Sequence, residues 1–430
     1  MGDGFGFLIF RSHFFANTPQ PRLMPGLFYF RPTDRFVKIK QSPDDFQVDE
    51  CTDVVPSDGP YSLYRLEKSG WTTPDALSAI RRRWQIRVHR VSYGGLKDRH
   101  ARTTQHLTIL DGPRKHLAQK GIVLTYLGQT PEPFSSLSIR GNRFRLVVRD
   151  LGVDEVEAAH AALDEVKCDG VANYFDDQRF GSVEQGTDFV ARRLVLGDFE
   201  GALKLALTAP YEFDRGAMKK EKATLVQHWG DWPTCKQNLS RGHARSLVDY
   251  LVSHPQDFRG AFTRLRAELG SLYLAAYQSH LWNNMLVNWL RRTLPEHQRI
   301  AVRLKLADVP MPLGLTNAQR VELAGWSLPL SSARLRYEVQ IAGTPPDWPD
   351  ALREALAADG IELGQLRLRG LRRPFFSRGE RAVLCLPEGL GATSDADDRH
   401  PDRFKMIIGF ELPRGSYATL IVKRAFAAIR

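Results

Sequence analysis

Segments that alternate apolar and polar residues lie near the two ends of this 430-residue chain, and this distribution constrains the fold most. Alternation of this kind is typical of half-buried β-strands. Between residues 189 and 359 the apolar residues are mostly spaced as in helices. A chain of this length is expected to form two or three domains. The segments with strand character are 36–40, 46–50, 106–110, 144–149 and 404–412.

The composition is that of a soluble globular protein, with 43% hydrophobic and 25% charged residues. The formal net charge of +11 favours a polyanionic partner, but alone it does not distinguish a nucleic acid from no partner at all. The cysteines Cys51, Cys168, Cys235 and Cys385 lie far apart and form no CxxC pair. This spacing indicates reduced thiols in a cytoplasmic protein, and neither a zinc site nor a disulfide framework.

Residues 1–35 are predicted to be an N-terminal extension that is disordered or partly docked. The apolar patches 5–10 and 27–30 are too short for a membrane span, which needs about 18 apolar residues. No continuous apolar stretch precedes a small-residue cleavage site, as it would in a signal peptide. We therefore expect no association with a membrane.

Candidate catalytic and phosphate-binding residues are concentrated in the segment 92–105, where a glycine pair precedes a single carboxylate, Asp98. The glycines allow a sharp turn or a close approach to a ligand. Neighbouring cations lower the pKa of a carboxyl group, so Asp98 should be ionised near neutral pH. An ionised Asp98 suits a nucleophile or an electrostatic partner better than a general acid. The cations that are candidates for binding phosphates are Lys97, Arg99, His100, Arg102 and Arg90.

The same stretch also fits a Gly-Gly turn on a solvated loop, in which Asp98 caps a backbone amide. On spacing alone we favour this structural interpretation over a catalytic one, because charged runs of this kind are common on protein surfaces.

Two helices have clear signals in the sequence. One is predicted to begin at Thr73-Pro74-Asp75 with Thr73 as N-cap. The other covers 271–292, with one buried stripe that includes Leu272 and Trp282 and with Asn283 beside it. Arginines crowd the end of the first helix, where cations often reflect only solvation and the helix dipole. Because this helix leads into the Asp98 loop, we favour a stripe that contacts phosphates, made of Arg81, Arg82, Arg83 and Arg87.

Five sequence blocks between residues 38 and 426 resemble the TruD family of tRNA pseudouridine synthases. The most specific are Gly-Leu-Lys-Asp-Arg-His-Ala at 95–101 with Thr-Thr-Gln at 103–105, and Asn-Tyr-Phe-Asp-Asp-Gln-Arg-Phe-Gly at 173–181. The others are Lys40 to Glu50, Gly-Asn-Arg-Phe at 141–144 and Leu-Pro-Arg-Gly-Ser-Tyr-Ala-Thr at 412–419. All five follow the family order, so the chain is similar to this family over nearly its whole length.

The resemblance implies roles for individual residues. Asp98 matches the catalytic aspartate, Lys40 matches a lysine beside it, and Phe46 matches a phenylalanine of the uridine pocket. Asn142 and Phe144 match residues that hydrogen-bond to the flipped target uracil and stack on it, which is how proteins normally hold an unpaired base.

Tyr417 corresponds to a phenylalanine of the substrate pocket in the family pattern. Tyrosine keeps the ring and adds a hydroxyl group, so the fine contacts with the base can differ from those of the family. We nevertheless expect Tyr417 to bind substrate.

The fold implied by the resemblance is α+β, with a mixed, mainly antiparallel sheet and flanking helices of the pseudouridine-synthase type. Residues 36–181 and 372–430 would form the catalytic domain together, interrupted by a TruD-type α+β insertion domain at 182–371. A cleft between the two domains would hold RNA, since such junctions often bind ligands.

The implied activity is isomerisation of a uridine in tRNA, at position 13 by family resemblance, to pseudouridine. Nothing is gained or lost overall, so no cofactor and no metal is expected. We expect a cytoplasmic monomer that binds tRNA and needs no protein partner.

Two alternatives remain at this point. A non-catalytic RNA-binding protein would share the cations and the aromatic residues. A nucleic-acid hydrolase would typically need clustered acids to hold metal ions, and Asp98 has no acidic neighbour in its loop.

Overall fold

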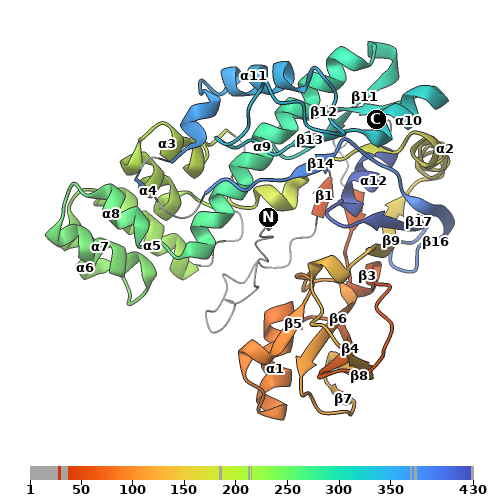
Figure 1. The fold of residues 1–430 in the computed structure, drawn as a ribbon, viewed down its shortest axis with the longest axis horizontal. Helices are drawn as coiled ribbons and strands as arrows, with labels where there is room; N and C mark the ends of the chain where they lie inside the picture. The colour runs from red at the N-terminus through yellow and green to blue at the C-terminus, as the bar shows by residue number, and fades with distance from the viewer. Residues whose placement is uncertain are drawn as a thin grey trace, which may run out of the picture. The chain divides into compact units, whose positions relative to one another are not determined.

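The computed structural model describes residues 28–30, 37–183, 186–211, 214, 216–368, 370–371 and 375–427 (Figure 1). The chain forms two compact units, and each unit is built from two segments. The first unit comprises Met1–His160 and Pro387–Gly415, and the second comprises Ala161–Leu386 and Ser416–Arg430. No helix within the described ranges is long and apolar enough to cross a membrane.

Among its described residues, the first unit contains an 11-stranded sheet. Its long strand β9 pairs antiparallel with β17 along one edge and with β2 and β3 along the other. Strands β3 and β6 pair in parallel, whereas the remaining pairs within the described part of this sheet are antiparallel. The strands are β1 (Phe28–Phe30), β2 (Val37–Ile39), β3 (Phe46–Cys51), β4 (Tyr61–Lys68), β5 (Val91–Tyr93), β6 (Arg102–Leu110), β7 (Leu117–Gln119), β8 (Ile122–Thr130), β9 (Gly141–Leu151), β16 (Glu388–Ala396) and β17 (Phe404–Pro413). The predicted α+β fold with a mixed, mainly antiparallel sheet is confirmed.

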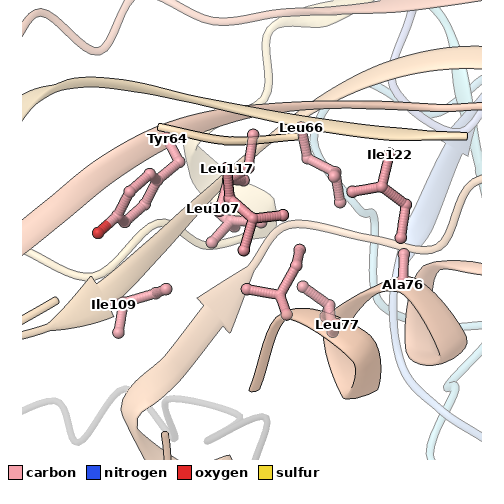
Figure 2. Packing of buried hydrophobic residues seen from close by; sticks show 10 residues of the cluster. Tyr64, Leu66, Ala76, Leu77, Leu107, Ile109, Leu117 and Ile122 are labelled. Atoms are coloured by element: carbon pink, nitrogen blue, oxygen red, sulfur yellow. The ribbon is translucent and has the colours of Figure 1, made fainter. Parts of the chain in front are cut away.

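Helix α1 (Thr73–Trp84) packs on one face of this sheet and forms a hydrophobic core with it (Figure 2). Ala76 and Leu77 of the helix lie close to Leu66, Leu107 and Ile122 of the strands, and all five side chains are buried. The apolar face of α1 thereby holds the helix beside the strands that flank the Asp98 loop.

The prediction that Thr73 caps α1 is wrong by one residue. Thr72 is the N-cap, and its side chain accepts a hydrogen bond from the backbone N–H of Asp75. Thr73 lies inside the first turn and is buried. Either of two adjacent threonines can serve as a cap. The hydroxyl group of Thr73 bonds to Lys97 and Gln105 instead, so Thr72 caps the helix.

The second unit is mainly helical and contains the long helix α9 (Ala267–Thr293), against which α3 (Val190–Val195) and α11 (Trp348–Ala358) pack. The predicted helix at 271–292 is confirmed, and Ser279, Trp282, Leu286 and Trp289 of its predicted stripe are buried, but burial is not confined to that stripe. Leu272 is exposed and Asn283 is buried. The side chain of Asn283 exchanges hydrogen bonds of 2.9 Å with the backbone of Phe175, so a polar group is tolerated inside.

Shorter elements complete the second unit. Helix α2 (Val153–Asp169) begins in the first unit and ends in the second. The other helices described are α4 (Phe199–Thr208), α5 (Gly216–Gln227), α6 (Trp232–Asn238), α7 (His243–Ser253), α8 (Phe258–Thr263), α10 (Asn317–Gly325) and α12 (Ala418–Ala425). Three antiparallel pairs are β10 (Val171–Ala172) with β15 (Leu384–Cys385), β11 (Arg299–Arg303) with β12 (Asp308–Pro312), and β13 (Ser327–Pro329) with β14 (Glu380–Ala382).

Of the predicted extension 1–35, residues 28–30 are described, and they form β1, which pairs with β2. The rest of that extension lies outside the described residues. The predicted division into a catalytic domain, 36–181 with 372–430, and an insertion at 182–371 stays a prediction.

Candidate active site

The loop that carries Asp98 connects β5 to β6 and packs tightly against a neighbouring segment. A Cβ atom on Gly94 would lie 2.4 Å from Cδ1 of Ile139 and 2.9 Å from the carbonyl oxygen of Ser135. A side chain cannot be accommodated at such distances without a shift. Gly94 therefore allows a close backbone approach to another segment of the protein, and the approach of the glycine pair to a ligand stays a prediction.

Lys40 and Asp98 form the central contact of the site. The Nζ atom of Lys40 lies 2.6 Å from Oδ2 of Asp98, and the Lys40 side chain is fully buried whereas 34% of the Asp98 side chain is exposed. Lys40 has a φ angle of 61°, in the left-handed region where residues with a side chain are strained. Such strain persists only where the surrounding structure enforces it, and it is common at functional sites.

The carboxyl group of Asp98 is held in its ionised form. Burial alone would raise its pKa, but the charge and hydrogen bond of Lys40 outweigh burial and bring the pKa below its usual value. The backbone N–H of His100 also donates to Oδ1 of Asp98 over 3.0 Å, which favours the same form. The site therefore presents a partly exposed carboxylate with a buried counter-ion behind it.

Lys68, which sequence reasoning did not identify, fixes the backbone around Asp98. It is buried at the end of β4, and its ammonium group donates to the carbonyl oxygens of Trp71, Lys97 and Asp98 at 2.9, 3.2 and 2.8 Å. Burial lowers the pKa of Lys68 to about 8, although the charge of Asp98 acts in the opposite direction. The alternation of β4 could have indicated a buried lysine, but not its three acceptors.

Thr73 connects helix α1 to the same loop. Its hydroxyl group accepts a 2.9 Å hydrogen bond from the backbone N–H of Lys97 and donates to Oε1 of Gln105 over 2.8 Å. The amide group of Gln105 in turn donates to the carbonyl oxygen of Gly95. The loop is thus held from the helix on one side and from β6 on the other.

A buried ion pair lies beside the Asp98 loop. The Nζ atom of Lys97 is 3.0 Å from Oε2 of Glu50, and the side chains are 10% and 0% exposed. Lys97 also donates to Oδ1 of Asn142 over 2.7 Å, and Glu50 accepts the backbone N–H of His106 over 2.8 Å. Burial opposes ionisation of Glu50, but the bonds from His106 and the charge of Lys97 bring its pKa below the usual value.

The predicted pocket residues Phe46, Asn142 and Phe144 come together on β3 and β9. Phe144 and Asn142 are cross-strand partners of Val48 and Glu50, so all three predicted residues face the same side of the sheet. The rings of Phe46 and Phe144 meet edge to face at 6.4 Å, and both are buried. The ammonium group of Lys40 lies 3.9 Å from the ring centroid of Phe46, a cation–π contact that joins the aromatic pair to the carboxylate.

The five cations predicted to bind phosphates have different environments. Lys97 is engaged by Glu50, and the guanidinium group of Arg90 donates to the carbonyl oxygens of Leu110 and Asp111 at 2.8 and 3.1 Å. Burial lowers the pKa of His100 despite the charge of Asp98, which disfavours its cationic form. The contacts of these three residues within the protein would compete with a phosphate. Their binding of phosphate stays a prediction.

Arg99 and Arg102 remain better placed to bind phosphates. Arg102 is largely exposed and lies 3.8 Å from Oδ1 of Asp44, which is exposed as well. Arg99 uses its Nε atom to donate to the carbonyl oxygen of Gly70 over 3.1 Å. No group of three or more His, Cys, Asp or Glu side chains suited to a metal ion occurs among the residues that the structure describes.

Tyr417 belongs to the second unit, whereas the other predicted site residues belong to the first. It is the N-cap residue of α12, and its ring lies 6.4 Å from that of Phe175. The guanidinium carbon of Arg381 lies 5.6 Å from the centroid of Tyr417 and 4.3 Å from that of Phe175. Burial raises the pKa of Tyr417, so its hydroxyl group stays protonated at neutral pH.

The family profile of TruD, tRNA pseudouridine synthase D, matches residues 28–425 of this chain. The chain belongs to the TruD family. A relative named probable tRNA pseudouridine synthase D 1 from Methanococcus maripaludis is 28% identical over 401 residues, which cover 91% of this chain and 99% of the relative. The tRNA pseudouridine synthase D of Leptospira interrogans is 28% identical over 395 residues, which cover 90% of this chain and 95% of that protein.

A solved structure extends the TruD assignment to the fold. The crystal structure of a TruD protein from Methanosarcina mazei superposes with a TM-score of 0.69 at 25% identity, covering 90% of this chain and 93% of that one. The predicted pseudouridine-synthase-type fold is confirmed, as is the prediction that the chain is an isomerase of the tRNA pseudouridine synthase class.

Proposed function

We propose that this TruD protein converts one uridine of tRNA, at position 13 by family resemblance, to pseudouridine with Asp98 as the catalytic residue. The observation that carries the proposal is the 2.6 Å contact between Lys40 and Asp98. It keeps a carboxylate ionised while about a third of that side chain (34%) stays open to a substrate. A loop with only a capping role would not require a buried lysine in a strained conformation behind it.

The target nucleotide must leave its stack before Asp98 can reach the ribose. The ionised carboxylate then either attacks C1′, forming a bond that breaks again when C5 bonds to C1′, or removes the proton from C2′ and returns it to C2′ in that later step. The C1′–N1 bond breaks, the uracil turns, and a bond forms between C5 and C1′. The proton lost from C5 is matched by a proton gained at N1, so atoms and electrons balance within the substrate.

The remaining residues hold and orient the base. Phe46 and Phe144 supply the aromatic wall, and Tyr417 supplies a further ring by family resemblance. Asn142 accepts a hydrogen bond from Lys97 with its carbonyl oxygen, and the amide group points its N–H donors away from that contact. These N–H groups can donate to a uracil carbonyl oxygen. Lys40 neutralises and orients Asp98.

The test is pseudouridine mapping on an unmodified tRNA transcript and on the same transcript with cytidine in place of the target uridine. The proposal expects one new pseudouridine in the first RNA and none at that position in the second. Binding of both RNAs without any product would instead favour a non-catalytic RNA-binding protein.

A further inference from the structure

A cavity of about 570 Å³ lies next to the Asp98 loop within the first unit. This volume is in the range of roughly 300–1,000 Å³ that is usual for ligand sites. The residues of its lining that carry the argument are Trp71, Asp75, Arg81, Arg82, Ile86 and Arg99. We propose that this cavity binds a backbone phosphate of the tRNA together with an adjacent unpaired base. The proposal rests on the proposed function, because it assumes an RNA substrate.

Positive charge in the cavity exceeds negative charge. Three guanidinium groups face one carboxylate, and that carboxylate accepts a 2.7 Å hydrogen bond from the hydroxyl group of Thr72. Arg81 and Arg99 use their Nε atoms to donate to the carbonyl oxygens of Ile86 and Gly70. These bonds fix the two side chains and leave their terminal nitrogens for a ligand. A guanidinium fork matches the geometry of a phosphate group.

The helix dipole does not account for this convergence. It favours cations in the last turn of α1, where Arg81, Arg82 and Arg83 all lie. Yet Arg83 is not part of the cavity lining, and Arg99 reaches the cavity from the Asp98 loop, outside the helix. Cations from two separate elements therefore meet at one cavity.

Trp71 provides an aromatic surface beside these cations. Its indole N–H donates to the carbonyl oxygen of Lys120 over 3.2 Å, which fixes the ring. Aromatic rings combined with arginines are the usual means of binding unpaired nucleotides, through stacking and charge. This combination favours RNA over a simple anion such as inorganic phosphate.

The cavity wall and the Asp98 loop are joined by hydrogen bonds. Arg99 donates to the carbonyl oxygen of Gly70, and the backbone N–H of Gly70 donates to the carbonyl oxygen of Arg99 over 3.2 Å. Lys68 donates both to Trp71 and to Asp98. An RNA bound in the cavity would therefore contact the same loop that carries the catalytic residue.

The experiment compares two charge reversals in the same unit, Arg82→Glu inside the cavity and Arg114→Glu, in the loop after β6, outside it. Both side chains are exposed, and both variants change the net charge equally. The Kd for the cytidine-substituted tRNA transcript is measured by filter binding at several salt concentrations, with circular dichroism as a check on folding. This RNA reports binding without any need for turnover.

For Arg82→Glu we expect the Kd to rise at least about tenfold and the slope of log Kd against log salt to fall by about one. Arg114→Glu should change the Kd by less than about threefold. Equal effects of both variants would show a diffuse charge effect and overturn the cavity site. If wild type binds the transcript and makes no pseudouridine in the unsubstituted RNA, the proposed function fails while the comparison of Kd values still decides the cavity.

Discussion

The Nζ atom of Lys40 lies 2.6 Å from Oδ2 of Asp98, and these residues are 58 positions apart in the sequence. Lys40 follows β2, whereas Asp98 lies in the loop before β6. The left-handed backbone at Lys40 and the three carbonyl contacts of Lys68 hold the two partners in place. The pair gives the TruD site an ionised carboxylate whose counter-ion is shielded from water.

Removing the counter-ion should impair catalysis more than RNA binding. We expect Lys40→Met to lower the single-turnover rate constant at neutral pH about 100-fold or more, because a positioned charge next to the reacting group is lost. Without Lys40, burial is no longer outweighed and the pKa of Asp98 should rise. Asp98 is active in its ionised form, which is present above its pKa. A higher pKa of Asp98 should therefore move the acid limb of the pH–rate profile to higher pH.

The matched control is Lys115→Met, which removes one exposed lysine from the same unit. Its rate constant and acid limb should equal those of wild type. A Lys40→Met enzyme with a normal acid limb would show that Lys40 does not govern the ionisation of Asp98.

The buried pair of Glu50 and Lys97 should contribute strongly to stability. Removing one partner leaves a buried charge, which typically costs about 3–5 kcal/mol. We expect Glu50→Ala to lower the free energy of unfolding by about that amount, measured by urea denaturation. Glu67→Ala, which removes one partner of the partly exposed Arg65–Glu67 pair, should lower it by less than about 1 kcal/mol.

The pKa of Glu50 also predicts how this stability depends on pH. Its folded-state pKa is depressed, so the contribution is present above the ordinary carboxyl range and is lost as pH falls through the lowered value. The difference in stability between wild type and Glu50→Ala should therefore shrink in acid. A constant difference down to about pH 2 would contradict an ionised Glu50.

The activity should decline as pH rises through about 8, since burial lowers the pKa of Lys68 to about 8. A neutral amine has two N–H groups for the three carbonyl oxygens that the ammonium group holds. The Asp98 loop should then loosen and the single-turnover rate constant should fall. Lys68→Arg, which cannot lose its charge in this range, should lack that step if it folds.

The stability effect of Lys68 has the opposite sign. Its folded-state pKa lies below the unfolded value, so between about pH 8 and 10.4 the unfolded chain binds more protons than the folded chain. The contribution of Lys68 to the free energy of unfolding therefore rises with pH.

The activity prediction has its own control. If Lys68→Arg lost activity at alkaline pH to the same extent as wild type, that loss would belong to another group.

The sequence predicted the site residues that lie in a motif of the family or in a strand with alternating apolar and polar residues. Lys40, Phe46, Asp98 and Asn142 lie in motifs, and the alternation of β3 and β9 placed the pocket residues on one face of the sheet. Lys68 was missed because its role depends on the carbonyl groups of Lys97 and Asp98, which are 29 and 30 positions away in the sequence, and no periodicity reports such contacts.

Burial inside a packed unit explains the other differences. The sequence shows Lys97 as a basic residue beside Asp98, but its partner Glu50 becomes visible only once β3 and β6 are adjacent. Helix α9 was expected to have one buried side, yet α3 and α11 both pack against it. Polar residues such as Asn283 are then buried with backbone partners that no helical pattern encodes.

The most direct test of the account is pseudouridine mapping of an unmodified tRNA pool treated with wild type or with Asp98→Asn, alongside the binding affinity of both proteins for the RNA. Asparagine keeps the shape of the side chain and removes its charge. The account predicts a new pseudouridine with wild type, at least about a 10⁴-fold slower reaction with Asp98→Asn, and similar RNA affinity for both proteins. Product formed by Asp98→Asn at a rate near that of wild type would contradict the central role of Asp98.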